Sequence, residues 1–173
     1  MESLRVIHLL GMKILKIMAI LLLIVGLGSG AGAQTTRKDN ENAKQAAIKK
    51  SVGEKSYTFT ANQATPLGGG PIILNSIYDL RIKGDSVISF LPYYGRAYFD
   101  VGYNAADGGI KFTSTKFAYK SVEKTKGGWV ITIKPTDVKN ITSLILRVSQ
   151  DGYASLYISC VNRDAITFDG YLE

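Results

Sequence analysis

Apolar and polar residues alternate along almost the whole chain after Tyr57. In the first such segment, threonines separate Tyr57, Phe59 and Ala61. A period of two is typical of a strand that turns one face to a core and the other to water. We therefore expect strands at residues 57–61, 78–83, 87–91, 110–115, 117–125, 129–134, 144–149, 153–160 and 166–172.

Short turn signals separate these segments, and they are Gly84-Asp85, Gly108-Gly109, Gly127-Gly128 and Asp151-Gly152. Glycine pairs of this kind favour tight hairpins. No helical interval is long enough for a parallel crossover. The pattern therefore predicts an all-β fold, an antiparallel meander of about eight to ten strands that curls into a small barrel to hide its edges. One long irregular stretch is expected at residues 62–71, where Pro66 and three consecutive glycines interrupt regular structure.

A polar segment at residues 34–55 precedes the strands and has helical rather than strand periodicity. Asp39 or Asn40 is a candidate N-cap, and Gly53 a candidate end. We expect a short helix that lies on the barrel or leads into it. Its apolar stripe is thin and consists of Ala43, Ala47, Ile48 and Val52.

The first 33 residues have the layout of a secretion signal. Lys13 and Lys16 form a basic start, residues 17–25 are apolar, and Ala31-Gly32-Ala33 is a small-x-small cleavage site. The apolar stretch is shorter than the roughly 20 residues that a membrane-spanning helix needs. We expect residues 1–33 to be cleaved, with translation starting at Met1 or Met12; a retained anchor is the alternative. The protein is then periplasmic or secreted, with membrane contact only through the signal during export.

Cleavage would remove the only histidine, His8, and leave Cys160 as the only cysteine. A Ser-His-Asp or Cys-His apparatus and a zinc site of the usual kind are then excluded. Residues 34–173 carry 18 Lys and Arg against 13 Asp and Glu, a net charge of +5. The lysines are spread along the chain rather than clustered in a stripe, so we expect no nucleic-acid partner.

Two side chains are expected in the core because of their neighbours at period two. Trp129 shares a face with Ile131 and Ile133. Cys160 shares a face with the apolar residues Ala154, Leu156 and Ile158. Because no histidine can activate its thiol, we interpret Cys160 as an inert core residue rather than a nucleophile.

The alternation breaks at residues 91–99, which hold four aromatic residues with Pro92, Gly95 and Arg96. Here the chain resembles the domain-of-unknown-function 4251 family, secreted proteins mostly from Bacteroidetes. The most specific matching block is Leu91-Pro92-Tyr93-Tyr94-Gly95-Arg96-Ala97. Further matching pieces are Tyr78-Asp79-Leu80, Gly84-Asp85, Gly108-Gly109-Ile110-Lys111-Phe112, Gly128-Trp129, Asp151-Gly152-Tyr153-Ala154 and Asn162-Arg163. The resemblance implies one exported all-β domain, residues 56–173, of the lipocalin-like barrel type, and it supplies no activity.

Tyr93, Tyr94, Arg96 and Tyr98 are the candidate ligand-binding residues. Tyrosine offers flat apolar area with a hydroxyl, and arginine offers a planar fork for a carboxylate or a ring. Such a platform suits a hydrophobic, aromatic or glycan ligand. The alternative is structural: the tyrosines pack over a barrel end, and Arg96 is tied to a carboxylate or carbonyl.

We expect a non-catalytic binding or envelope-associated module, with no cofactor, no metal and no catalytic residue. One alternative is a hydrolase of envelope or dietary glycans that uses tyrosine and carboxylates, for which the candidates are Asp79, Asp85, Asp100 and Asp107. Another is a structural or inhibitor protein that docks another envelope protein. The barrel interior separates these readings, because an apolar cavity favours a ligand and a filled interior favours docking.

Overall fold

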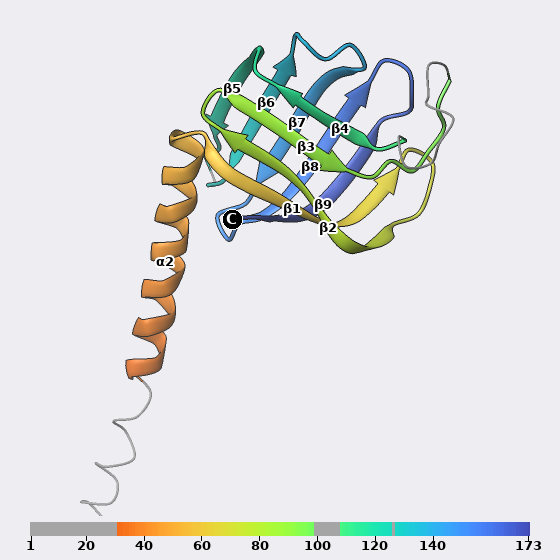
Figure 1. Ribbon diagram of the computed structural model, residues 1–173. Helices are drawn as coiled ribbons and strands as arrows, with labels where there is room; N and C mark the ends of the chain where they lie inside the picture. Colours follow the sequence, from red (N-terminus) through yellow and green to blue (C-terminus); the bar gives the residue numbers. More distant parts are fainter. Residues whose placement is uncertain (1–30, 99–107, 126) are drawn as a thin grey trace, which may run out of the picture. The chain divides into compact units, whose positions relative to one another are not determined.

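The computed structural model describes residues 31–98, 108–125 and 127–173, with side chains from Lys38 onward (Figure 1). The predicted apolar segment at residues 17–25 and the carboxylates Asp100 and Asp107 lie outside the described residues. The chain divides into two compact units, Met1–Asn42 and Ala43–Glu173. The elements are α2 (Ala31–Gly53), β1 (Ser56–Pro66), β2 (Ile72–Lys83), β3 (Ser86–Leu91), β4 (Ile110–Ser114), β5 (Phe117–Glu123), β6 (Trp129–Pro135), β7 (Ile141–Val148), β8 (Tyr153–Cys160) and β9 (Ile166–Leu172).

The nine strands form one antiparallel sheet in the order β4-β3-β2-β1-β9-β8-β7-β6-β5. Strands that follow one another in sequence pair with one another, except β4 and β5. The first and last strands, β1 and β9, also pair, with Phe59 opposite Leu172. The sheet therefore curls into a nearly closed barrel, which confirms the predicted all-β meander (Figure 1).

The seam of the barrel lies between β4 and β5, which are the two edges of the sheet. Asp137, in the β6–β7 loop, fastens the corner that joins them. Its Oδ1 accepts a hydrogen bond from Ser114 Oγ, and its Oδ2 accepts bonds from the backbone N–H groups of Thr115 (2.9 Å) and Lys116 (3.2 Å). The Ser114 bond is the largest cause that lowers the pKa of Asp137. This carboxylate thus ties the corner between β4 and β5 to the β6–β7 loop.

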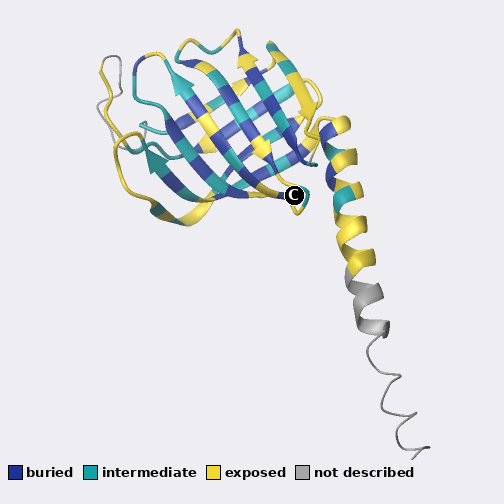
Figure 2. Ribbon diagram, turned by 180° about the vertical axis from the view of Figure 1, so that it is seen from behind, coloured by how far each residue is buried: buried dark blue, intermediate teal, exposed yellow. Residues whose placement is uncertain are grey.

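Inward and outward residues alternate along the strands, as the buried and exposed bands of Figure 2 show. Trp129 is buried with Ile131 and Ile133, as predicted. Many interior side chains have no surface that a water molecule could touch, so the space between them is filled. The largest of these are Phe59, Phe168, Leu80, Ile82, Leu91, Ile131, Ile133, Leu144, Leu146, Leu156, Ile158 and Ile166.

Small residues occupy one row across the inner face, where Ala61, Gly170 and Ala154 are direct neighbours on β1, β9 and β8. A Cβ on Gly170 would collide with the carbonyl oxygen of Thr60. The approach of β1 to β9 is that close because β1 bulges between Ala61 and Gln63. Glycine at this position is therefore a packing requirement.

The prediction of irregular structure at residues 62–71 is wrong over the first half of that stretch and correct over the second. Strand β1 continues to Pro66, residues 67–71 belong to no strand or helix, and β2 begins at Ile72. The bulge at Asn62 lets β1 resume its pairing with both neighbours, and Pro66 is tolerated because it is the last residue of the strand. The early part of β2 is largely exposed, so it lacks the clean alternation that predicts a strand.

The helix differs from the prediction at its start and agrees with it at its end. Residues are already helical at Ala31, so Asp39 and Asn40 lie inside α2 rather than at its N-cap. This stretch holds alanines and no proline, and nothing in it breaks a helix. Of the predicted stripe, Ile48 and Val52 join the barrel core, whereas Ala43 and Ala47 are exposed. Ile48 and Val52 are one helical turn apart, so both side chains lie on the same face of the helix and can contact the core.

Cys160 confirms the predicted register but not full burial. Ala154, Leu156 and Ile158 are buried on the same face, while Cys160, the last residue of β8, is only partly buried. Burial is the main cause that raises the pKa of its thiol. A raised pKa leaves little thiolate at neutral pH, which agrees with an unreactive cysteine.

Candidate functional site

The segment after β3 folds against the β8–β9 loop at one end of the barrel. Asp164 N donates to the carbonyl oxygen of Arg96 (3.0 Å), and Tyr98 N donates to that of Asn162 (2.9 Å). Between these bonds, Ala97 and Arg163 form an isolated antiparallel bridge. The predicted break in alternation is therefore a return to strand-like pairing with a distant part of the chain.

Tyr93 stabilises the contact between these two segments. Its hydroxyl donates to the carbonyl oxygen of Arg96 (2.7 Å) and lies 3.1 Å from that of Asp164. The Arg163 guanidinium covers its ring, 4.7 Å from the centroid, and Arg163 Nη1 donates to the carbonyl oxygen of Gly108 (2.7 Å). Burial raises the pKa of Tyr93. The hydroxyl and one face of this tyrosine are used within the chain.

Tyr98 and Arg96 point elsewhere. The Tyr98 hydroxyl donates to Asp164 Oδ1, and this bond is the main reason that the pKa of Tyr98 is raised. Its ring is 64% exposed, which leaves it open to a partner. The Arg96 side chain is exposed and makes no hydrogen bond or ion pair within the described part of the chain. The arginine that braces the loop is Arg163, not Arg96.

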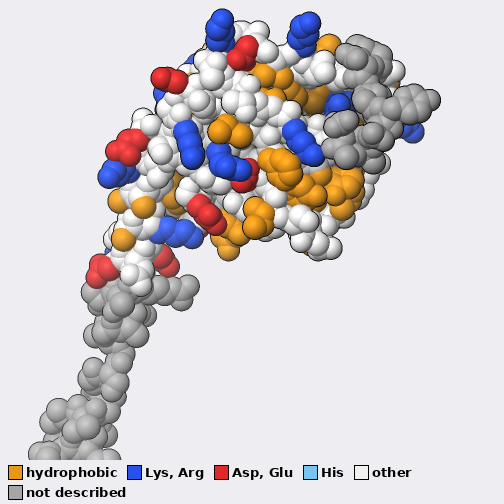
Figure 3. Space-filling view, in the orientation of Figure 1, with side chains coloured by type: hydrophobic (Ala, Val, Ile, Leu, Met, Phe, Trp, Pro, Cys, Tyr) orange, Lys and Arg blue, Asp and Glu red, His pale blue; other side chains and the backbone are white. Residues whose placement is uncertain are grey.

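An open cleft of about 410 Å³ lies beside this loop, and we call it the aromatic cleft. It is lined by Tyr78, Phe90, Pro92, Tyr93, Tyr94, Gly108, Gly109 and Lys111. The rings of Tyr78 and Phe90 stack with centroids 5.9 Å apart and an interplanar angle of 23°. Lys111 Nζ lies 5.1 Å from the Phe90 centroid. Figure 3 shows hydrophobic side chains gathered on this side of the barrel, with lysine and arginine side chains beside them.

The cleft divides the four candidate residues into two pairs. Tyr93 and Tyr94 line it, whereas Arg96 and Tyr98 are not among its lining residues. Sequence reasoning missed Phe90 and Lys111, which are direct neighbours on β3 and β4. The one available signal was that Phe90, 43% exposed, is apolar on the outward face of an alternating strand.

One of the candidate carboxylates of the hydrolase alternative, Asp79, forms an ion pair with Arg81. Both Asp79 oxygens lie 3.1 Å from Arg81 Nε, and the ion pair is partly buried on β2. In the described ranges, no three side chains of the usual ligand types come together as a metal site. None of the helical segments described here is both long and apolar enough to cross a bilayer.

The family model described as domain of unknown function (DUF4251) matches residues 39–172. No protein with curated annotation matches the chain. Among solved structures, the chain is similar to a crystal structure of a DUF4251 family protein from Bacteroides eggerthii DSM 20697. The two are 15% identical with a TM-score of 0.55, over 75% of this chain and 87% of that one. The structural likeness supports the fold, and the match over residues 39–172 shows that the chain belongs to the DUF4251 family.

Proposed function

We propose that the protein is an exported, non-catalytic binding module that holds the flat apolar surface of a ligand in the aromatic cleft. One observation carries this proposal: Phe90, 43% exposed, stacks on the partly buried Tyr78, with the Lys111 ammonium beside its ring. An exposed aromatic ring held in place by a second ring offers flat area at low entropic cost, which suits an aromatic compound, a sugar ring or an aromatic side chain of an envelope protein.

The filled interior favours a docking surface over a ligand site inside the barrel, so the proposal places the ligand or partner group on the outside of the barrel. In lipocalin-type barrels that hold a ligand, the ligand lies inside the barrel. Here Leu80 and Leu91, the inward residues of β2 and β3 behind the cleft, have no exposed surface. A ligand must then contact the outside of the sheet, where the cleft provides concave apolar area.

A neutral aromatic probe tests the cleft directly. We expect N-phenyl-1-naphthylamine to bind with a fluorescence increase, and Phe90→Ala to weaken that binding several-fold because it removes the outer ring of the stack. Val122→Ala is the matched control, since Val122 is 47% exposed on β5 and does not line the cleft. Equal affinity in Phe90→Ala and the native protein would refute the assignment of this cleft.

Export has its own test. The basic start, the apolar segment and the Ala31-Gly32-Ala33 site support cleavage before Gln34. Mass spectrometry of the protein from the native envelope or culture fluid should then find an N-terminus at Gln34. A chain that retains Met12 in that fraction would contradict the proposal.

A further inference from the structure

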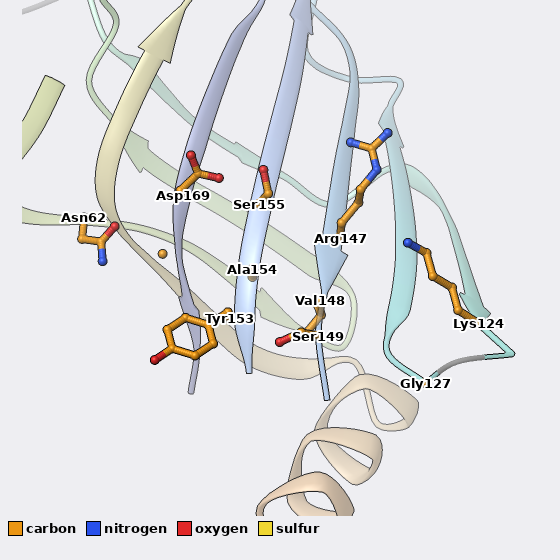
Figure 4. A pocket seen from close by; sticks show the side chains of 11 residues that line it. Asn62, Lys124, Gly127, Arg147, Val148, Ser149, Tyr153, Ala154, Ser155 and Asp169 are labelled. Atoms are coloured by element: carbon orange, nitrogen blue, oxygen red, sulfur yellow. The ribbon is translucent and has the colours of Figure 1, made fainter. Parts of the chain in front are cut away.

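A second concave region, the polar groove, lies on the outer face of β7, β8 and β9 and has a volume of about 500 Å³ (Figure 4). None of its lining residues lines the aromatic cleft. The residues around it are Asn62, Lys124, Gly127, Arg147, Val148, Ser149, Tyr153, Ala154, Ser155, Asp169 and Gly170. Val148, Ala154 and Gly170 serve the packing of the barrel. The side chains of Arg147, Ser155 and Asp169, in contrast, alternate with these inward residues and face away from the core.

Strand register places three polar side chains of the groove in one row. Arg147 on β7 is opposite Ser155 on β8, and Ser155 is opposite Asp169 on β9. Directly opposed residues have Cβ atoms about 5 Å apart, so the three groups act on the same ligand-sized area. Asn62, the residue at the bulge of β1, lies at the far side, beyond Asp169 (Figure 4). Donors and acceptors thus span the groove from one wall to the other.

The charges in the groove have no internal partner. Arg147, Lys124 and Asp169 make no side-chain hydrogen bond or ion pair with any residue that the structure describes. Arg147 and Lys124 lie on one side of the groove, and Asp169 lies on the other (Figure 4). This separation leaves a cationic half and a half that accepts hydrogen bonds. An arginine fork with no partner is suited to a carboxylate or sulfate.

Tyr153 supplies the apolar surface of the groove. Its side chain is 71% exposed, and Tyr171, directly opposite on β9, is 41% exposed. The backbone of Ala154 and Gly170, whose side-chain positions face the inside of the barrel, contributes to the floor of the groove. A large open tyrosine beside a row of hydrogen-bonding groups matches a ligand with one flat C–H face and many hydroxyls.

We propose that the polar groove is a binding site for an acidic saccharide. The sugar face packs on Tyr153, Arg147 and Lys124 bind its carboxylate or sulfate, and Asp169, Ser155 and Asn62 hydrogen-bond its hydroxyls. Asp169 argues against a polyphosphate, since its carboxylate repels a ligand that is anionic throughout. The proposal is independent of the aromatic cleft, which lacks this set of polar groups.

Isothermal titration of the purified protein with three acidic probes tests the site: trigalacturonate, a glucuronate-containing oligosaccharide and a heparin-derived tetrasaccharide. We expect binding of at least one, and Arg147→Gln should weaken it about tenfold or more, the value of a charged hydrogen bond. Tyr153→Ala should weaken it several-fold. Matched controls are Lys120→Gln on β5 and Tyr157→Ala on β8, which lie outside the groove and should bind as the native protein does.

Two ligand controls separate charge from sugar recognition. The methyl ester of trigalacturonate keeps the sugar but lacks the charge, and inorganic sulfate keeps a charge but lacks the sugar. Weaker binding of both supports the proposal. If the ester binds as tightly as trigalacturonate, the cations do not recognise the ligand, and the proposal is wrong. If sulfate binds as tightly, the groove is only an ion site, and the proposal is also wrong. No binding of any acidic probe overturns the proposal, and so does an equal loss in the control variants. The naphthylamine experiment with Phe90→Ala is unaffected by either result, so the two sites fail separately.

Discussion

Two clusters of tyrosines lie at different places on the barrel, and they differ in how much ring surface is exposed to solvent. Next to α2, the hydroxyls of Tyr57 and Tyr119 lie 3.2 Å apart, and Tyr119 lies 3.5 Å from the Val52 carbonyl oxygen. At the β8–β9 loop, Tyr93 donates to the carbonyl oxygen of Arg96, and Tyr98 donates to the Asp164 carboxylate. The first cluster is closed by a helix. The second leaves the Tyr98 ring exposed and one face of Tyr93 toward the aromatic cleft.

The pKa of Tyr98 is raised by a different cause from the pKa values of Tyr57, Tyr119 and Tyr93, for all of which burial is the largest cause. For Tyr98 the leading cause is its hydrogen bond to the Asp164 carboxylate. A tyrosine can thus serve as a brace in the core or at the surface, and only the surface brace leaves ring area that a ligand can reach. Exposed area, rather than the presence of tyrosine, distinguishes a binding region from a structural one.

The largest expected effect is at the closed cluster. Tyr57→Ala should lower the free energy of unfolding by about 3–5 kcal/mol, because it empties a core position under α2. Urea denaturation of the two proteins measures the difference. Tyr98→Ala is the counterpart in the second cluster and should cost about 1 kcal/mol or less, because its ring is exposed. A similar loss in both variants would show that burial does not separate the clusters.

A smaller effect is expected from the arginine that covers Tyr93. Arg163→Ala should cost about 1–2 kcal/mol, since it removes a cation–π contact and a hydrogen bond to the Gly108 carbonyl oxygen. Arg96 lies next to Ala97, the residue that bridges to Arg163. The free energy of unfolding of Arg96→Ala should stay within about 0.5 kcal/mol of that of the native protein. Melting curves of the two variants settle the comparison. The reverse order would mean that Arg96 is the structural residue of this loop.

The third expected effect is a dependence on alkaline pH. The pKa of Tyr57 is raised from its ordinary value of 10.0, so the folded state keeps this proton while the unfolded state loses it. The stability that this proton contributes is therefore complete below pH 10 and is lost as the pH rises above it. One tyrosine contributes a slope of about 1.4 kcal/mol per pH unit in that range. Tyr57→Phe should reduce the slope by about that amount, as urea denaturation between pH 10 and 11.5 would measure. If the slope of the unfolding free energy against pH is unchanged in Tyr57→Phe, the titration of another group causes it.

Local pattern was sufficient for much of this fold. Alternation reports which face of a strand is buried, so Trp129 and the register of β8 follow from it. Glycine at a positive φ reports a turn, as Gly84 and Gly152 do in their hairpins. The block of residues 91–97 was specific enough to indicate the family.

Only the tertiary structure decided which distant residues meet. Arg163 and Tyr93 are neither periodic nor close in sequence, and they are neighbours because the β3–β4 and β8–β9 connections meet at one end of the barrel. The aromatic cleft depends on the register of β3 against β4, which brings Lys111 to Phe90. The polar groove depends in the same way on three paired strands. Periodicity fixes the face of a residue, but the long-range pairing of strands fixes its neighbours, and a binding site is made of neighbours.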